Sequence, residues 1–231
     1  MKIILNYEIA SDFKASTDLE VLPLRPYGRL LQPVRSHADM LVCIIENTVF
    51  SYSDYIDENS AVFEYIQDRG YKLVRCTPPL CQEYPNDIGL NVAIVGKRLF
   101  CNEKFTAKEI REYASEKGIE IINVKQGYTA CSTLVLDESN VITADLTIKR
   151  AMEGVGINVL FIDEENIRLP GYNNGFIGGA GVVVGRDVYF FGDAKNLRAY
   201  DKISTLIHSL GMGEFSISSG EVFDFGGGKV I

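Results

Sequence analysis

The hydrophobic positions of this chain recur in short blocks that favour one arrangement, which is strand, tight turn, strand, helix and strand. The stretch from Gln126 to Ile162 shows this arrangement completely. Its expected elements are a strand at Ser132–Leu136, a strand at Val141–Thr143, a helix capped by Asp145, and a strand at Ile157–Ile162 after Gly156. The pattern predicts a mixed α/β unit in which a helix connects the last two strands.

Similar blocks recur at intervals of about 40 to 50 residues, a period typical of propellers and repeat arrays. The blocks begin near Ser36, Tyr84, Gln126 and Gly171. A glycine ends each expected helix and precedes the next apolar strand; these are Gly70, Gly118, Gly156 and Gly211. Because two strands precede each helix, the order differs from the alternation of one strand with one helix in a Rossmann-like sheet.

Local patterns add detail to the first two blocks. The continuous apolar run Leu41–Ile45 predicts a buried strand, and an amphipathic helix is expected over Asp57–Arg69. In the second block, Thr106 and Glu109 have the spacing of a capping box. The second helix is therefore expected to begin directly after Thr106.

The two ends of the chain carry complementary parts of a fifth block. The C-terminal part has an expected strand at Val222–Phe225 and three glycines, but no helix. The N-terminal part has expected strands at Lys2–Leu5 and Leu19–Leu24, with helical turns at Glu8–Lys14 between them. We expect the ends to meet and complete this block, which removes open sheet edges. Residues 1–231 then form a single domain.

Composition and charge narrow the classes of partner. The formal net charge of −8 disfavours binding to a nucleic-acid backbone and favours a small cationic or amino-acid-like ligand. No apolar run reaches the roughly 18 residues that span a bilayer, and the first residues lack the features of a signal peptide. We therefore expect a cytoplasmic protein that binds neither nucleic acid nor membrane.

The cysteines and glycines give no indication of a cofactor. The chain has five cysteines with no C-x-x-C pair and only two histidines, so reduced thiols are expected and a metal site is not. Cys43 and Cys101 lie in apolar runs and are expected in the core. The run GFIGGAGVVVG is followed by a strand pattern rather than a helix, which argues against nucleotide binding.

A ring of five strand-strand-helix-strand units resembles the pentein fold, the α/β propeller of arginine and agmatine deiminases, dimethylarginine hydrolases and amidinotransferases. The motifs that resemble this superfamily are HADM (His37–Met40), NDIG (Asn86–Gly89) and FDFGGG (Phe223–Gly228). The strings GYTACSTLVLDESNVITAD and LPGYNNGFIGGAGVV resemble an uncharacterised bacterial family with the guanidine-modifying-enzyme fold. The resemblance implies a five-bladed propeller with pseudo-fivefold symmetry.

The chain departs from the enzyme pattern at the catalytic residues. The deiminases place a nucleophilic cysteine a few residues after the glycine run, whereas here Lys229, Val230 and Ile231 follow it and the sequence stops. Their catalytic histidine opens the preceding unit, which here opens with Tyr172-Asn173-Asn174. The resemblance therefore implies an altered or inactive site.

In such a ring the starts of the inner strands point at the centre, so residues from different units converge there. Cys131, His37 and Asp39 are the candidate catalytic residues, and Asp87, Asn86 and Asn174 are the candidate ligand-binding residues. A cysteine nucleophile needs a lowered pKa and a nearby base or cation, and carboxylates bind a guanidinium through charge-assisted hydrogen bonds. Other interpretations stay open: Cys131 as a core residue, His37 bonded to backbone, and the two aspartates as turn caps.

Two functions follow from these residues. The first is a protein that binds a guanidino or amino-acid-like ligand, with Cys-dependent hydrolase or amidinotransferase chemistry. The alternative is a non-catalytic interaction module, similar to the pentein-fold ribosome anti-association factors. Cys131 within hydrogen-bond reach of His37, with both lining a pocket, would favour the first. Cys131 among aliphatic side chains, with a flat apolar outer face, would favour the second.

Overall fold

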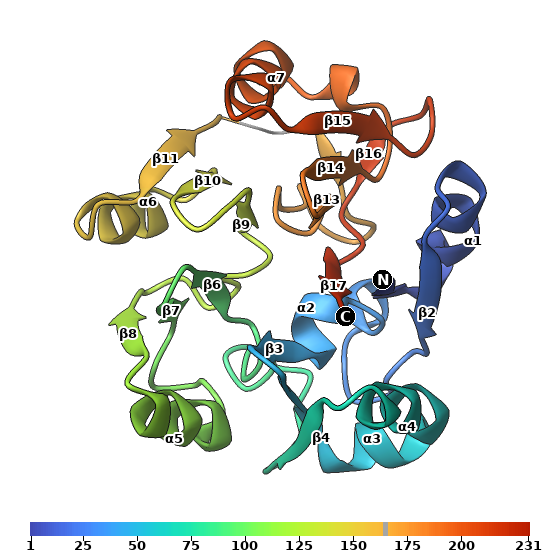
Figure 1. The fold of residues 1–231 in the computed structure, drawn as a ribbon, viewed down its shortest axis with the longest axis vertical. Helices are drawn as coiled ribbons and strands as arrows, with labels where there is room; N and C mark the ends of the chain where they lie inside the picture. The colour runs from blue at the N-terminus through green and yellow to red at the C-terminus, as the bar shows by residue number, and fades with distance from the viewer. Residues whose placement is uncertain (164–165) are drawn as a thin grey trace.

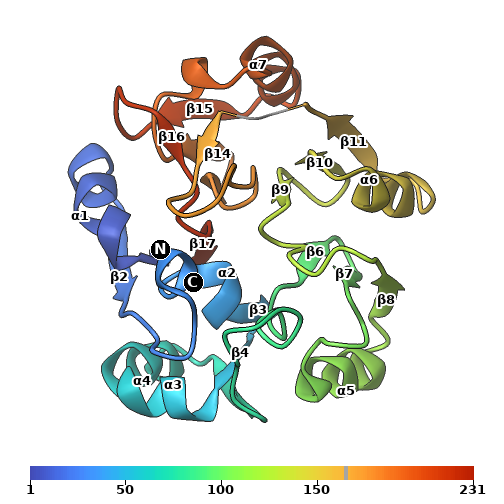
Figure 2. The same ribbon diagram turned by 180° about the vertical axis from the view of Figure 1, so that it is seen from behind.

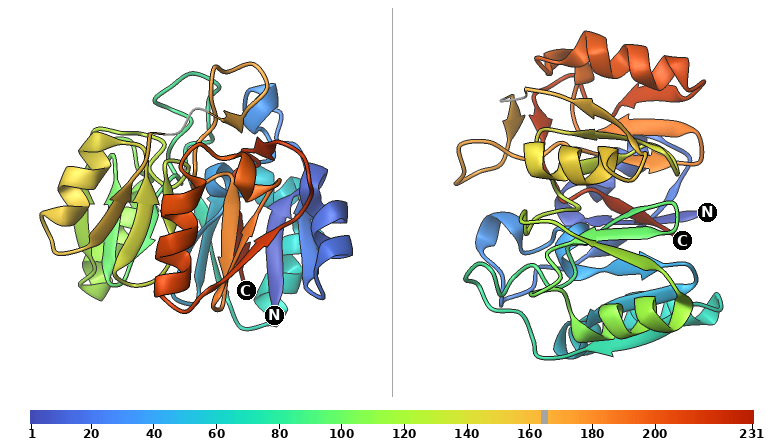
Figure 3. Two further views of the ribbon diagram at one scale, coloured as in Figure 1. Left: turned by 90° about the horizontal axis from the view of Figure 1, so that it is seen from above. Right: turned by 90° about the vertical axis from the view of Figure 1, so that its left-hand side faces the viewer.

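The computed structural model describes residues 1–163 and 166–231. Figure 1 shows small sheets that follow one another around a centre, with α1 and α3 to α7 on the outer side of the ring and α2 (Ala38–Leu41) near its middle. Figure 3 shows the two termini on one face and long loops on the opposite face, among them the teal loop near residue 85 and the orange loop near residue 175. The ring therefore has two different faces, and loops gather on only one of them.

Four consecutive sheets share one topology, in which an antiparallel pair is followed by a helix and a third strand that runs parallel to the second. The first sheet has β3 (Cys43–Ile45), β4 (Thr48–Tyr52) and β5 (Lys72–Cys76), with α3 (Ser53–Glu58) and α4 (Ser60–Asp68). The second has β6 (Ala93–Val95), β7 (Arg98–Cys101) and β8 (Glu120–Asn123), with α5 (Lys108–Lys117). The third has β9 (Thr133–Val135), β10 (Asn140–Thr143) and β11 (Asn158–Phe161), with α6 (Leu146–Glu153). The fourth has β13 (Gly181–Val184), β14 (Asp187–Phe190) and β15 (Gly213–Ser216), with the 3-10 turn η2 (Ala194–Asn196) and α7 (Tyr200–Ser209).

The two ends of the chain build another three-stranded sheet, as the sequence predicts. Its strands are β17 (Gly228–Val230), β1 (Lys2–Asn6) and β2 (Glu20–Leu24), and α1 (Tyr7–Ser16) connects the last two. Backbone hydrogen bonds of 2.9 Å in both directions join Lys2 to Ile231. Figure 2 shows the termini side by side at this sheet.

The strand expected at Val222–Phe225 is shorter than predicted and belongs to a different sheet. Only Val222–Phe223 (β16) is a strand, and it pairs with β12 (Ile167–Arg168) in a separate two-stranded sheet. The strand that pairs with β1 begins instead at Gly228, the last of the three glycines. The mixed α/β class is confirmed, whereas the five-bladed propeller stays a prediction.

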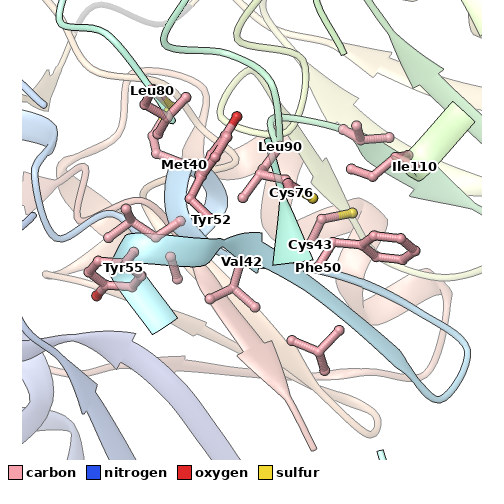
Figure 4. Close-up of a cluster of buried hydrophobic side chains, with 14 of the residues drawn as sticks. Met40, Val42, Cys43, Phe50, Tyr52, Tyr55, Cys76, Leu80, Leu90 and Ile110 are labelled. Carbon is pink, nitrogen blue, oxygen red and sulfur yellow. The ribbon is translucent and has the colours of Figure 1, made fainter. Parts of the chain in front are cut away.

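The core lies between the sheets and the helices that cover them. Phe63 and Ile66 of α4 are fully buried, and burial of each side chain contributes about 2–3 kcal/mol. Figure 4 shows Cys43 and Phe50 of the first sheet in the same cluster as Ile110 of α5. The core is therefore continuous between neighbouring sheets, and the expectation that Cys43 is a core residue is confirmed.

Several local predictions are confirmed. The four helix-stop glycines have positive φ, between +65° and +86°, a region that glycine enters without a steric penalty. Asp145 caps α6, because its side chain accepts hydrogen bonds from the amides of Thr147 and Ile148. Along the described part of the chain, none of the helices has the length and apolar character to cross a membrane.

Two predicted elements are present with different bounds. Residues Ala38–Leu41 form a short helix, α2, so the first strand starts only at Cys43. The helix expected over Asp57–Arg69 is two helices separated at Asn59.

The capping box is absent. The cap residue of α5 is Ala107, and Thr106 instead donates its hydroxyl to the Asn102 carbonyl at 3.0 Å. Glu109 accepts hydrogen bonds from the amide and hydroxyl of Thr77, each at 3.1 Å. A partner 32 residues away in sequence has therefore displaced the local one.

Candidate functional site

A cavity of about 330 Å³ lies at the centre of the ring. The first strand of each three-stranded sheet contributes to its wall, and Figure 1 shows these strands innermost. They are β3, β6, β9, β13 and β17. Of the lining residues in the described ranges, Asp39 is the one acid and Lys229 is the one base. The cavity thus combines aliphatic walls with one charge of each sign.

Asp39 is a buried acid without a well-aligned donor. Asp39 belongs to α2 and is 3% exposed, and neither carboxylate oxygen accepts a well-aligned hydrogen bond from the described residues. The Cys131 thiol lies close enough to interact with this carboxylate. Burial raises the pKa of this carboxyl from 3.8 to about 6; the nearby His37 opposes that rise and the Asp224 charge adds to it. The backbone amide of Asp39 donates to the carbonyl of Gly226 at 3.0 Å, which fixes α2 against the glycine run.

His37 and Asp224 form a second buried pair next to Asp39. His37 Nδ1 lies 3.7 Å from Asp224 Oδ1, and both side chains are at most 2% exposed. The Asp224 carboxylate accepts hydrogen bonds from the amides of Phe176 (2.9 Å) and Gly226 (3.0 Å), while burial raises its pKa. His37 Nε2 has no partner in the part of the chain that the structure describes. His37 is fully buried and does not line the central cavity.

The glycine run is required by this arrangement. Gly226 has φ +78°, and a Cβ at this position would lie 2.2 Å from the Cβ of His37. Any other residue would therefore collide with His37. The motif FDFGGG thus serves to pack the backbone against the histidine.

The Cys131 side chain is buried and accepts a hydrogen bond from Asn91. The Asn91 amide donates to the Cys131 sulfur at 2.9 Å, and the Asn91 oxygen accepts from the amide of Ala130 at 2.7 Å. Burial, followed by the charges of Asp39 and Asp224, raises the pKa of the thiol well above its usual value. The thiol of the ligand-free protein is therefore protonated.

The candidate catalytic residues form one cluster, but not with the expected contacts. His37 is paired with Asp224, and Cys131 with Asn91. The described residues include no hydrogen bond between His37 and Cys131, and neither residue lines the central cavity, whereas Asp39 does. Neither of the two arrangements that would separate the functional hypotheses is therefore met in full.

Asp87 is bonded to Tyr128, whose ring lies in a row of aromatic side chains next to the candidate catalytic residues. The Tyr128 hydroxyl donates to one Asp87 oxygen at 2.6 Å, and the other oxygen has no partner among the described residues. Burial raises the pKa of Asp87. The Tyr128 ring is 5.5 Å from the ring of Tyr84 and 6.0 Å from that of Phe176, whose amide binds Asp224. Asp87 is thus linked to the centre through Tyr128 and Phe176.

Asn86 and Asn174 lie in two other cavities. Asn86 lines a pocket of about 580 Å³, and Asn174 lines a cavity of about 150 Å³ together with Gln126. The side-chain oxygen of Asn174 accepts from the amide of Ile167 at 3.2 Å. The structure therefore does not gather Asp87, Asn86 and Asn174 around a single cavity.

Three residues of this site were missed in the sequence. Asp224 lies within FDFGGG, where only the glycines were considered, and Asn91 starts an apolar run that indicated only a strand. Lys229 gave no signal, because its role depends on the pairing of β17 with β1. No group of three or more metal-ligating side chains occurs in residues 1–163 and 166–231.

Comparisons with known proteins agree with this architecture. A model of a "Family of unknown function (DUF6873)" matches residues 5–228. A search of curated proteins gives no match.

Several solved structures are similar to this chain. A cysteine-to-serine mutant of DDAH from Pseudomonas aeruginosa, complexed with citrulline, is 14% identical with a TM-score of 0.60, and the match covers 94% of this chain and 92% of that one. An amidinotransferase from Microseira wollei in the saxitoxin pathway is 10% identical with a TM-score of 0.56, covering 94% and 77%. A C. jejuni agmatine deiminase with substrate bound is 12% identical with a TM-score of 0.50, covering 93% and 75%. At these identities the likeness establishes the fold, and the predicted resemblance to the pentein fold is confirmed.

Proposed function

Since this chain belongs to the family of unknown function DUF6873 and has the pentein fold, we propose that its central cavity binds a small guanidino or amino-acid-like cation. In this proposal the five three-stranded sheets are the blades of a propeller, and the innermost strands form the wall of the ligand site. Asp39 is the counter-charge of the ligand.

The observation that carries this proposal is the buried carboxylate of Asp39, neither oxygen of which accepts a well-aligned hydrogen bond from the described residues, although the Cys131 thiol and His37 lie near it. A buried charge without partners is costly, and proteins ordinarily pair such groups or bind a cation at them. A guanidinium offers two parallel N–H donors, which match the two oxygens of a carboxylate. A bound cation would thus form charge-assisted hydrogen bonds with the Asp39 carboxylate and offset the cost of burying its charge.

The remaining wall suits an amino-acid-like ligand. The volume of about 330 Å³ is at the lower end of the range for small-molecule sites. Ile44, Ile94 and Val135 provide aliphatic contacts, and Lys229 supplies a positive charge for a carboxylate group. Relatives of the same fold include DDAH complexed with citrulline, which supports this class of ligand.

We extend the proposal to Cys-dependent chemistry, which would make the protein a hydrolase, deiminase or amidinotransferase. Because Cys131 is buried beside the cavity and is not part of its wall, this step requires that ligand binding brings the thiol into the wall. The Asp39 and Asp224 carboxylates help to raise the pKa of the Cys131 thiol in the ligand-free protein. A cation bound at Asp39 offsets this negative charge and lowers the pKa of the thiol. The thiolate nucleophile would then form only in the presence of ligand.

A thermal-shift screen tests the binding step. The compounds are agmatine, arginine, methylarginines and creatine, because a ligand that binds only the folded protein raises its melting temperature. We expect a dose-dependent rise that is lost in Asp39→Asn and kept in Asp12→Asn, an exposed aspartate in α1. An equal shift in both variants would rule out Asp39 as the counter-charge.

Turnover is measured separately, as ammonia or ureido product released from any compound that binds. We expect Cys131→Ser to abolish turnover while the thermal shift remains. A thermal shift without turnover in the wild-type protein would mean that the protein binds the ligand without transforming it, which would refute the proposed Cys-dependent reaction. The absence of any shift at millimolar ligand would refute the cation site and favour the non-catalytic interaction module.

A further inference from the structure

We infer that a second pocket binds a small oxyanion, a molecule with a phosphate or carboxylate group. This basic pocket is defined by Arg29, Lys104, Lys108 and Arg111 together with Thr77, Cys81 and Asn86. Its volume is about 580 Å³, and it shares no lining residue with the central cavity. The site is therefore independent of the cation site proposed above.

The basic pocket lies where the first two sheets meet. Its wall includes Tyr52 at the end of β4, the loop after β5, and the residues that lead into α5. Gly89 is part of this wall, and its backbone carbonyl accepts from the amide of Ala107 at 2.8 Å. This contact holds the loop against the start of α5, so the wall is built by the fold rather than by a single surface segment.

The charge of this wall is opposite to that of the whole protein. Four of its residues are basic and none is acidic, although the chain carries a net charge of −8. Arg29 is paired with Asp54 at 2.7 Å, but within the described ranges Lys104, Lys108 and Arg111 make no ion pair. Arg111 donates to the Thr106 carbonyl at 3.2 Å, and Lys104 lies 5.1 Å from the centre of the Phe105 ring, and these contacts leave both positive charges in place. Cations gathered in one concave site attract anions and concentrate them.

The position of two of these cations on α5 strengthens the argument. Lys108 is the first residue of the helix and Arg111 the fourth, whereas the helix dipole favours negative charge at that end. The helix also begins without a side-chain cap, and Glu109 is turned towards Thr77. The first turn of α5 carries one acid, Glu109, which is engaged with Thr77, so an oxyanion in the pocket would complement the cations that remain at this end of the helix.

Cys81 provides a chemical reporter inside the pocket. It is the exposed cysteine of the chain, whereas the other four are buried. Arg29 lies close enough for its charge to interact with that of the Cys81 thiolate. An anionic alkylating reagent should therefore be drawn to Cys81, and a neutral reagent of similar size should not.

The experiment compares the alkylation rates of Cys81 by iodoacetate and by iodoacetamide, with the modified peptide identified by mass spectrometry. The same protein unfolded in urea gives the reference ratio for this thiol. We expect the iodoacetate-to-iodoacetamide ratio to be roughly three- to tenfold higher in the folded protein and to fall as salt is added. The double variant Lys108→Gln, Arg111→Gln should lower the ratio. The matched control Lys117→Gln, at the far end of α5, should leave it unchanged.

Competing anions identify the ligand group. One arm of the experiment adds inorganic phosphate or pyrophosphate, and the other adds citrate. In each arm we measure how far the anion slows the alkylation of Cys81 by iodoacetamide. Protection by one arm alone assigns phosphate or carboxylate as the preferred group, and protection by both supports the oxyanion class. A folded ratio equal to the unfolded one, no protection in either arm, or protection that persists in the Lys108→Gln, Arg111→Gln variant would overturn the inference.

Discussion

Replacing Asp39 with asparagine should make the protein more stable near pH 7 while it removes ligand binding. The carboxylate is fully buried and has no well-aligned donor among residues 1–163 and 166–231, so its charge opposes folding. Asparagine has nearly the same shape and no charge. A gain in stability combined with a loss of binding is what distinguishes a site residue from a residue that supports the fold.

The size of the effect follows from the pKa of Asp39. The value is about 6 in the folded protein and ordinarily 3.8, and this difference corresponds to about 3 kcal/mol of destabilisation when the group is ionised. A buried amide without partners costs about 1 kcal/mol in return. The net gain of about 2 kcal/mol should raise the melting temperature by about 4–8 °C in a chain of this length.

The stability difference between Asp39→Asn and the wild-type protein should increase with pH. Because the folded pKa is raised, the folded state binds a proton more tightly than the unfolded state does. The penalty is therefore fully present above about pH 6 and disappears as the pH falls from about 6 towards 4. Asp39→Asn should exceed the wild-type protein in stability most strongly near pH 7, and the difference should shrink near pH 5.

Urea unfolding of both proteins at a series of pH values measures this difference, with Asp12→Asn as the exposed control. The control should follow the wild-type curve. If Asp39→Asn is less stable than the wild-type protein near pH 7, then Asp39 has partners that favour folding and the argument fails. A stability difference that does not change with pH would also refute it, because the raised pKa would then be wrong.

The remaining predictions concern stability and reactivity. Gly226→Ala should lower the free energy of unfolding in urea by roughly 2–4 kcal/mol, because φ is +78° and the new methyl group would lie 2.2 Å from the Cβ of His37. The control Gly220→Ala should change it little, because the nearest neighbouring atom there is 3.9 Å away. Asp145→Ala should cost about 1 kcal/mol through loss of the α6 cap, and Asp145→Ser should restore most of it; equal losses in both would argue against capping. In the ligand-free protein Cys131 should resist alkylation near pH 7, and rapid labelling there would contradict its raised pKa.

The sequence by itself determined the elements and their repetition. Periodicity located most strands and helices, and the glycines with positive φ and the cap at Asp145 were identified because such signals act within a few residues. The incomplete blocks at the two ends also predicted that the termini pair, since each end lacked what the other supplied. These features depend on local backbone preference and on the need to close sheet edges.

The tertiary structure decided the contacts of the site. His37 contacts Asp224, and Cys131 contacts Asn91, although the partners are far apart in the sequence. Glu109 bonds to Thr77 and therefore does not form the local cap that its spacing from Thr106 predicts. Such partners depend on how neighbouring sheets pack, which no local pattern records. Burial then sets the charge of each group, because the pKa values of Asp39 and Cys131 rise through loss of water and through carboxylates brought close by the fold.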